Sequence, residues 1–361
     1  MHKKKGFIVL FVFFYILLLM SGCGSNTAEK PDTDKPQTYT ITDQMGRTVT
    51  LPVKINRIVC LQHHSLDILA ELQAQDKVVG VMKDWDNLLD SSFAKIFPGI
   101  ENMPQPGSLQ NASIEEIAAL QPDVVIVSNQ MPMETIDKLQ SMGIPVVAIT
   151  LYISDKEQAS TIHPELTDPD EAYTDGLQQA IQILGKIASK EEKADALWQY
   201  VIKNRQIVAE HLTSIPEEKR IHIYMANENM YTYGTGKYVG AAMARAGAKN
   251  VAETLHGYKQ VTPEQVAVWN PDVIFVQSRY ASILEQIKTS PAWSEINAVK
   301  NGCLYIAPDY TKPWGNPTPE SIALGEVWLA KTLYPEAFQD VDMNALVEDF
   351  YHTFYGISYQ D

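Results

Sequence analysis

One segment of this chain occurs twice, and it decides the fold. Residues 114–128 read IEEIAALQPDVVIVS, and residues 263–277 read PEQVAVWNPDVIFVQ. The Pro-Asp pairs at 122–123 and 271–272 are separated by the same offset as Glu115 and Glu264. Each copy predicts a short helix, a Pro-Asp turn and an apolar strand. A period this long indicates two similar lobes rather than a solenoid, and two lobes form a cleft between them.

Short apolar runs alternate with helical patterns on both sides of the repeat, which is typical of α/β lobes with mainly parallel sheets. The expected strands are 57–61, 78–82, 124–128, 145–150, 221–225, 273–277 and 303–307, and further helices are expected near 65–73, 319–333 and 343–355. The predicted domains are an N-terminal lobe over 38–168, a helical linker over 169–213 and a C-terminal lobe over 214–361.

The predicted linker contains one long helix. Ser189-Lys190-Glu191-Glu192 fits a capping box, and the stretch from 190 to 212 has no Gly or Pro. At ~1.5 Å per residue this helix would be roughly 34 Å long, enough to reach from one lobe to the other. We expect it to permit only modest opening and closing of the lobes.

The N-terminus predicts export and a lipid anchor. Residues 1–22 combine three lysines with a short apolar run, as in a signal peptide. Residues 19–23, LMSGC, resemble a bacterial lipobox, which implies lipidation of Cys23; an ordinary signal peptide or a short anchor is the alternative. Residues 23–37 then form a polar tether. Cys60 and Cys303, which fall in different halves, are expected to be free thiols.

Composition and motifs exclude several functions. The chain carries 29 Lys and Arg against 44 Asp and Glu, a formal net charge of −15, which argues against nucleic acid as a partner. The glycine-rich stretch 234–240, GTGKYVG, does not directly follow a strand, so we interpret it as a loop that opens a helix rather than a dinucleotide site. A metal-dependent extracytoplasmic hydrolase is the alternative from another class, but carboxylates are few at the strand ends. We therefore expect no enzyme activity and no cofactor.

Four segments together resemble the solute-binding proteins of ABC importers for iron–siderophores, haem and vitamin B12. They are 39–61 (YTITDQMGRTVTLPVKINRIVCL), 114–128, 247–253 (GAKNVAE) and 261–276 (VTPEQVAVWNPDVIFV). The resemblance implies two α/β lobes joined by one long helix. It also implies a protein on the extracytoplasmic face of the cell membrane that delivers its ligand to a permease with a cytoplasmic ATPase. We expect the protein to be a monomer. In that family one Glu of each lobe docks on permease arginines, and the matching positions are Glu115 and Glu264, with Glu116 as a competitor.

Ligands of open α/β sheets bind beyond the carboxyl ends of the strands. This rule selects aromatic, basic and amide side chains that follow the expected strands: His63, His64, Lys83, Trp85, Asn129, Tyr231, Tyr233, Arg279, Tyr280, Tyr310 and Trp314. Such a lining suits a sizeable, partly apolar ligand with negative charge. The expected ligand is an iron complex, a siderophore or haem, with His63 or His64 as a possible metal ligand. A corrinoid or an oxyanion such as molybdate or tungstate is the alternative.

Overall fold

A computed structural model describes residues 37–89, 93–161 and 163–359. The predicted signal peptide and Cys23 lie outside these residues. Within the described part of the chain, every helix is too short or too polar to cross a membrane.

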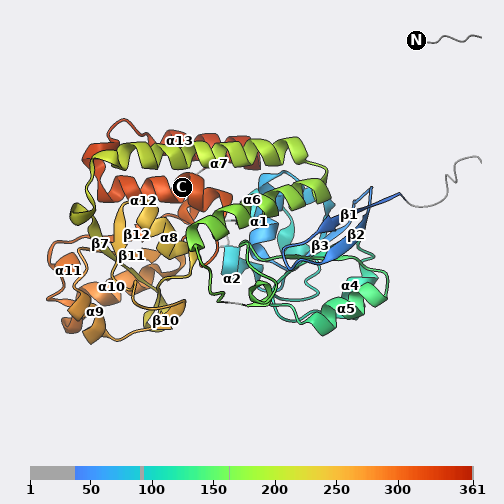
Figure 1. Ribbon diagram of the computed structural model, residues 1–361, viewed down its shortest axis with the longest axis horizontal. Coiled ribbons are helices and arrows are strands. Elements are labelled where there is room, and N and C mark those ends of the chain that lie inside the picture. The colour runs from blue at the N-terminus through green and yellow to red at the C-terminus, as the bar shows by residue number, and fades with distance from the viewer. Residues whose placement is uncertain (1–36, 90–92, 162, 360–361) are drawn as a thin grey trace, which may run out of the picture. The chain divides into compact units, whose positions relative to one another are not determined.

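Two lobes with the same sheet topology form the described chain (Figure 1). The N-terminal lobe has the strand order β4 (Val78–Val81), β3 (Ile58–Cys60), β5 (Val124–Ser128), β6 (Val146–Ile149). The C-terminal lobe has the order β9 (Ala248–Asn250), β7 (Ile221–Ala226), β11 (Val273–Gln277), β12 (Leu304–Ala307). All pairs within these two sheets are parallel. The repeated strands β5 and β11 take equivalent places, so the predicted pair of similar α/β lobes is confirmed.

Two antiparallel pairs and a set of helices complete the architecture. The pairs are β1 (Thr38–Thr42) with β2 (Thr48–Pro52), and β8 (Tyr231–Tyr233) with β10 (Tyr258–Gln260). The helices are α1 (His63–Glu71), α2 (Trp85–Leu89), α3 (Phe93–Ile96), α4 (Ile114–Ala119), α5 (Met133–Ser141), α6 (Pro169–Ala188), α7 (Glu191–His211), α8 (Tyr238–Arg245), α9 (Pro263–Trp269), α10 (Ala281–Thr289), α11 (Asn297–Lys300), α12 (Glu326–Leu333) and α13 (Met343–Phe350). A π-helical turn precedes α12 at Ser321–Gly325, and another follows α13 at Tyr351–Tyr355.

The repeated Pro-Asp turn has the same structural role in both lobes. The Asp123 carboxylate accepts hydrogen bonds from the backbone N–H groups of Asn56 (2.7 Å) and Arg57 (2.9 Å), which lead into β3. The Asp272 carboxylate accepts from the backbone N–H of His222 in β7 (3.3 Å). Each aspartate thus fastens the strand that follows it to the neighbouring strand of the same sheet, which gives a physical reason for the repeat.

The long helix is present as α7, but it begins differently from the prediction. Ser189 has φ 55° and ends α6 in the left-handed conformation, and Lys190 precedes α7 without a side-chain cap. The predicted capping box is therefore wrong, because Ser189 serves as the C-cap of a separate helix. That helix, α6, begins at Pro169 with the Asp168 carboxylate as its N-cap. The predicted lobe and linker boundaries remain predictions.

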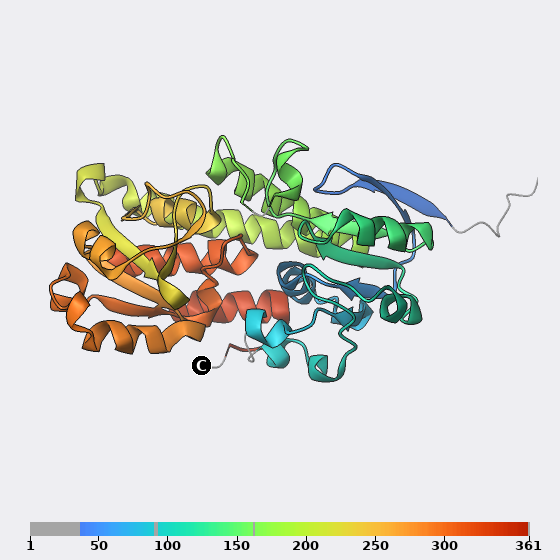
Figure 2. The ribbon, with the colours of Figure 1, turned by 90° about the horizontal axis from the view of Figure 1, so that it is seen from below.

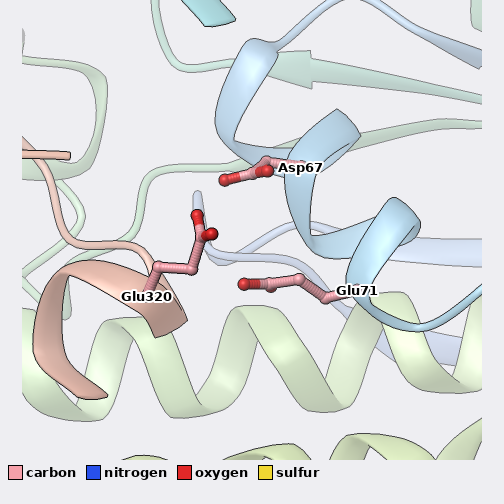
Figure 3. A group of neighbouring side chains, drawn as sticks. All are labelled: Asp67, Glu71 and Glu320. Atoms are coloured by element: carbon pink, nitrogen blue, oxygen red, sulfur yellow. The ribbon is translucent and has the colours of Figure 1, made fainter. Parts of the chain in front are cut away.

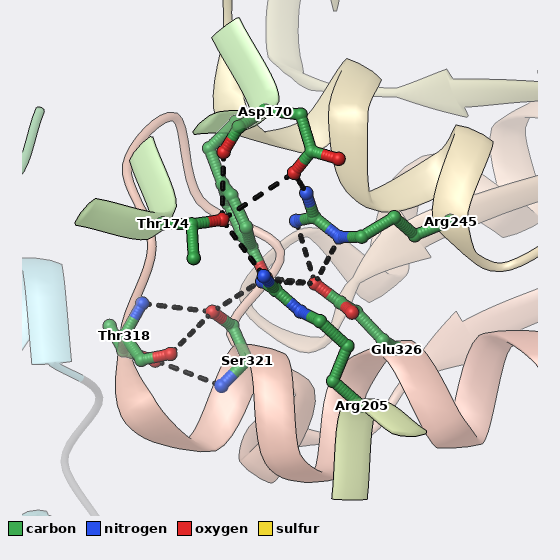
Figure 4. Close-up of polar contacts among 8 residues, drawn as sticks. Asp170, Thr174, Arg205, Arg245, Thr318, Ser321 and Glu326 are labelled. Atoms are coloured by element: carbon green, nitrogen blue, oxygen red, sulfur yellow. Dashed lines mark hydrogen bonds and ion pairs between the residues drawn. The ribbon is translucent and has the colours of Figure 1, made fainter. Parts of the chain in front are cut away.

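A buried ion network ties α6 and α7 to the C-terminal lobe (Figure 4). The Glu326 carboxylate of α12 is fully buried and pairs with Arg205 of α7 (3.3 Å) and Arg245 of α8 (2.7 Å). Arg245 also pairs with Asp170 of α6, and Arg205 donates to Thr174 of the same helix (2.8 Å). These contacts hold the N-terminal turns of α6 against α7, α8 and α12.

The C-terminal segment returns to the N-terminal lobe. Phe350, Tyr351, Phe354 and Tyr355 are buried in the same apolar cluster as the residues of β3 and α1. Figure 2 shows the C-terminal helices, drawn in red, running toward the blue α1. The end of the chain therefore links the two lobes in addition to α6 and α7.

Both described cysteines are free thiols, as expected. Cys60 is buried in β3, where burial raises the pKa of its thiol to about 12, so it stays protonated and unreactive.

Candidate functional site

A cavity of about 230 Å³ lies between side chains of the two lobes. Most of its lining follows the carboxyl ends of strands, where ligands bind in open α/β sheets. The lining residues are His63, His64, Leu88, Asn129, Gln130, Tyr152 and His163 from the N-terminal half, and Tyr233, Lys237, Tyr258, Arg279, Trp314, Gly315 and Asn316 from the C-terminal half. None of these described residues is acidic, whereas both Arg279 and Lys237 are basic.

His63 and His64 form the first turn of α1, directly after β3. Burial lowers the pKa of His63 to about 3, and the positive charges of Arg279 and Lys312 act in the same direction. Burial also lowers the pKa of His64 well below its ordinary value. Both imidazoles are therefore neutral at physiological pH, and each can donate one N–H. They lie at the amino end of a helix whose first turn has no acidic residue, which favours an anion there.

Trp314 packs against both imidazoles from the other lobe. Its ring centroid lies 5.6 Å from that of His63 and 5.4 Å from that of His64, in edge-on contacts. The two imidazole centroids are 4.0 Å apart. This aromatic group closes one wall of the cavity, and it joins α1 to the segment after β12.

Arg279 is held in place by a chain of amide groups. Its Nε donates to the Gln277 side-chain oxygen (2.8 Å), and the Gln277 amide nitrogen donates to the Asn227 side-chain oxygen (2.7 Å). The guanidinium lies 5.1 Å from the Tyr280 ring and 5.9 Å from the Trp314 ring. An arginine fixed in this way presents its remaining N–H groups in a defined plane, which suits an oxyanion.

Asn129 and Tyr152 organise the opposite wall. The Asn129 amide donates to the Tyr152 hydroxyl (2.8 Å) and to the Thr161 carbonyl (3.0 Å). The Tyr152 hydroxyl donates to the same carbonyl (2.7 Å). The two side chains therefore hold the loop between β6 and α6, which brings His163 to the cavity.

The structure brings six of the eleven predicted ligand residues to this cavity: His63, His64, Asn129, Tyr233, Arg279 and Trp314. It places the other five elsewhere, because the position of a residue at a strand end does not fix the direction of its side chain. Lys83 is exposed after β4, and Trp85 packs on Phe93 in the N-terminal core. Tyr231 stacks on Tyr258, Tyr280 lies beside Arg279, and Tyr310 is buried against Tyr359.

Lys237 is the main cavity residue that sequence reasoning missed. It belongs to the glycine-rich stretch 234–240, and α8 begins at the next residue, so this stretch is a loop that opens a helix, as expected. Burial lowers the pKa of Lys237 to about 8. The sequence feature that could have identified Lys237 is its place immediately before the helix that this stretch was expected to open. His163 and Tyr258 had none, because neither follows a predicted strand.

Neither histidine belongs to a cluster with metal-binding geometry. Within the described residues, Asp67, Glu71 and Glu320 are the one group of at least three His, Cys, Asp or Glu side chains close enough to share an ion. No carboxylate lines the cavity beside His63 and His64 in the described chain. The cavity thus provides hydrogen-bond donors and positive charge rather than a set of metal ligands.

Glu115 and Glu264 occupy equivalent places in the two lobes. Both are exposed in the first turn of a helix, α4 and α9, which begin with the side-chain caps Ser113 and Thr262. Figure 1 shows α4 and α9 on the same edge of the molecule, opposite α7. Hydrogen bonding to the backbone and to Thr262 lowers the pKa of Glu264, so this side chain is charged at neutral pH.

A family model described as periplasmic binding protein matches residues 58–311, most of the chain. The chain belongs to this family. The resemblance to solute-binding proteins of ABC importers is therefore confirmed, and members of this family act outside the cytoplasm together with a permease and its ATPase.

Two relatives in the family, one of them also known by its structure, bear on the ligand. The chain is 45% identical over 321 residues to the molybdate-binding protein MolA of Haemophilus influenzae, covering 89% of this chain and 92% of that one. The structure of MolA bound to molybdate matches with a TM-score of 0.86 at 44% identity, covering 89% and 99% of the two chains. The Fe(3+)-citrate-binding protein YfmC of Bacillus subtilis is 22% identical over 312 residues, covering 85% and 90%.

These findings correct the expectation of an iron complex as the ligand. The relative at 45% identity binds molybdate, whereas the one named for an iron chelate is only 22% identical. The physical reason for the error is the assumed size of the site. Trp85 and Tyr310, two of the aromatic residues expected to line the site, are buried in the core instead.

Proposed function

We propose that this protein is a lipid-anchored, extracytoplasmic solute-binding protein that captures a small tetrahedral oxyanion of the molybdate or tungstate class and delivers it to an ABC permease. It performs no chemistry on the ligand and uses no cofactor. The observation that carries the proposal is a small cavity with two basic side chains, neutral imidazoles and no acidic residue in its described lining. The similarity to a molybdate-binding relative supports it.

The size and charge of the cavity favour an oxyanion over the alternatives. Its volume of about 230 Å³ is below the roughly 300–1,000 Å³ of pockets for drug-sized ligands, which favours a small ligand over a corrinoid or haem. A buried dianion needs opposite charge and several hydrogen-bond donors to replace its water. Arg279 and Lys237 supply the charge, while His63, His64 and the amino end of α1 supply donors.

The decisive test is titration calorimetry of the mature protein with molybdate, tungstate, sulfate, phosphate, ferric citrate, haem and cobalamin. We expect binding of molybdate or tungstate. Arg279→Ala should weaken it by about 2–5 kcal/mol, the range for truncating one partner of a buried charge pair. Arg57→Ala is the matched control, because Arg57 is an exposed arginine that bonds to the Leu120 carbonyl at the base of the N-terminal lobe.

Two results would contradict the proposal. One is binding of an iron chelate or cobalamin without any binding of oxyanions. The other is oxyanion binding that is equally strong in Arg279→Ala and in the Arg57→Ala control.

The lipid anchor is proposed from residues 19–23, LMSGC, which resemble a lipobox. Cys23→Ser should move the protein from the membrane fraction to the soluble extracytoplasmic fraction. A mutant that remains as firmly membrane-bound as the wild type would contradict the anchor.

A further inference from the structure

One face of α1 extends from the cavity into a second buried polar group. His63, Asp67 and Glu71 are spaced by four residues, so their side chains lie along one side of the helix. His63 faces the cavity, whereas Asp67 and Glu71 are fully buried behind it. The same helix face therefore carries His63 of the ligand cavity and the buried carboxyl groups of Asp67 and Glu71.

The segment after β12 faces this side of α1 from the other lobe. Lys312 lies two residues before Trp314, and its ammonium contacts the Asp67 carboxylate at 2.6 Å and the Tyr355 hydroxyl at 3.0 Å. The Tyr355 hydroxyl donates to the other Asp67 oxygen at 2.8 Å. Lys312 also pairs with Glu320. We call Asp67, Glu71, Lys312, Glu320 and Tyr355 the interlobe cluster; Figure 3 shows the carboxylates of Asp67 and Glu71 on α1 and that of Glu320 converging on one point.

Lys312 is the single cation of the interlobe cluster, which contains three buried carboxyl groups. A buried carboxylate is costly unless it is paired, so the ammonium is needed to keep α1 and the 312–320 segment together. Burial, and after it the nearby Asp67, raises the pKa of Glu71 well above its ordinary value, which favours the protonated form of this carboxyl group.

The backbone of Lys312 shows that its position is constrained. Its φ is 35°, in the left-handed region that residues other than glycine adopt only when their surroundings hold them there. The next turn is tight, since the Trp314 N–H donates to the Lys312 carbonyl at 2.7 Å. The Lys312 ammonium also lies 5.6 Å from the Trp314 ring. Fixing the side chain of Lys312 thus fixes the entry of Trp314 into the cavity.

We propose that Lys312 is a positioning residue for the oxyanion cavity: its contacts with Asp67, Glu320 and Tyr355 hold the His63–His64 turn of α1 against the Trp314 loop. Lys312 does not line the cavity and acts on the ligand through these residues. The inference rests on the proposed function for the identity of the ligand. Its geometric part, the placement of Trp314 relative to the histidines, is independent of the ligand.

The test uses the double variant Lys312→Met/Asp67→Asn. The first substitution removes the positive charge of the pair, and the second removes its negative charge. We expect it to fold and to bind tungstate at least tenfold more weakly than the wild type. His63→Gln should then have a smaller effect on affinity in this background than in the wild type, because His63 is no longer held in register with Trp314. Arg245→Met is the matched control: it removes a partly buried cation that pairs with Glu326 outside the cavity, so it should lower Tm without changing affinity.

A ligand-free measurement separates this inference from the proposed function. The Trp314 fluorescence, obtained as the difference between each protein and its Trp314→Phe counterpart, should shift in the double variant and not in Arg245→Met. If the wild type binds no oxyanion, the proposed function fails, and the fluorescence still decides the role of Lys312. An unchanged Trp314 signal, or a lower Tm with wild-type tungstate affinity, would show that Lys312 is merely structural.

Discussion

Lys237 is a side chain in the cavity whose charge changes near physiological pH. Burial lowers the pKa of Lys237 to about 8. The ammonium is therefore about half protonated near pH 8 and loses its charge as the pH rises further. A bound dianion favours the protonated form and raises this pKa again. Tungstate affinity should therefore fall as the pH rises from about 7 to 9, while the anion keeps its own charge.

Calorimetry at several pH values tests this dependence on Lys237. Lys237→Met should bind more weakly at pH 7 and show a flatter profile, and its affinity should approach that of the wild type near pH 9. A wild-type profile that does not change over this range would contradict the assignment.

Glu71 gives a second pH effect, this time on stability. Its folded-state pKa is raised well above the ordinary value, chiefly by burial and then by Asp67, against the opposing effect of Lys312. The folded protein therefore holds a proton that the unfolded chain releases, and stability is lost as the pH rises above the ordinary Glu pKa. Asp67, Lys312, Glu320, Tyr351 and Tyr355 are the titratable groups around it.

Glu71→Gln should remove this loss, because glutamine keeps the shape and carries no proton to release. We expect the Tm of the variant minus the Tm of the wild type to be larger at pH 8 than at pH 5. A constant difference between the two pH values would show that Glu71 is ionised in the folded protein.

Individual site residues were predictable where a strand end alone determines their place. His63 follows β3, Asn129 follows β5 and Arg279 follows β11, and all three reach the cavity. Trp85 also follows a strand, but packing with Phe93 turns it into the core. Such orientation depends on contacts between segments that are distant in the sequence, which local patterns do not contain.

At the scale of elements, the apolar strands were the most predictable part. The stretches 124–128 and 273–277 are β5 and β11 with unchanged bounds, because continuous Val and Ile runs suit strands buried on both faces. The start of α7 was not predictable, since Ser189 fits a capping box and a C-cap equally well by composition. In the structure the backbone of Ser189 is left-handed at the end of α6, so this residue is the C-cap of α6.

Gly176 of α6 makes a close approach that a side chain would prevent. A Cβ at this position would overlap the backbone of Tyr152, the residue whose hydroxyl holds the wall of the cavity. Gly176→Ala should therefore destabilise the protein by about 1–3 kcal/mol, the usual cost of overpacking.

The same substitution should also weaken oxyanion binding, because α6 and Tyr152 must move apart. Denaturant unfolding and calorimetry of one preparation measure both effects. A stability equal to that of the wild type would show that α6 adjusts freely at this contact.

At the scale of the whole molecule, Glu115 and Glu264 lie on helices at one edge, and we propose that both dock on the permease (Figure 1). Glu115→Arg with Glu264→Arg should abolish uptake, because like charges in contact cost several kcal/mol by order of magnitude. Ligand affinity should be unchanged, since neither residue lines the cavity.

Glu134→Arg is the matched control for the docking test, as Glu134 is exposed in the first turn of α5. It should leave both uptake and affinity near wild-type values. Normal uptake by the Glu115→Arg/Glu264→Arg protein would remove these residues from the mechanism.

The equivalent places of α4 and α9 have a consequence for encounter with the permease. If both glutamates dock as proposed, a permease built from two like subunits could receive the protein in either of two orientations with the lobes exchanged, because the two lobes share one strand order. Glu115 and Glu264 exchange roles between these orientations. The neighbouring residues do not match, since Glu116 carries a charge and Gln265 does not. This difference in charge would distinguish the two orientations.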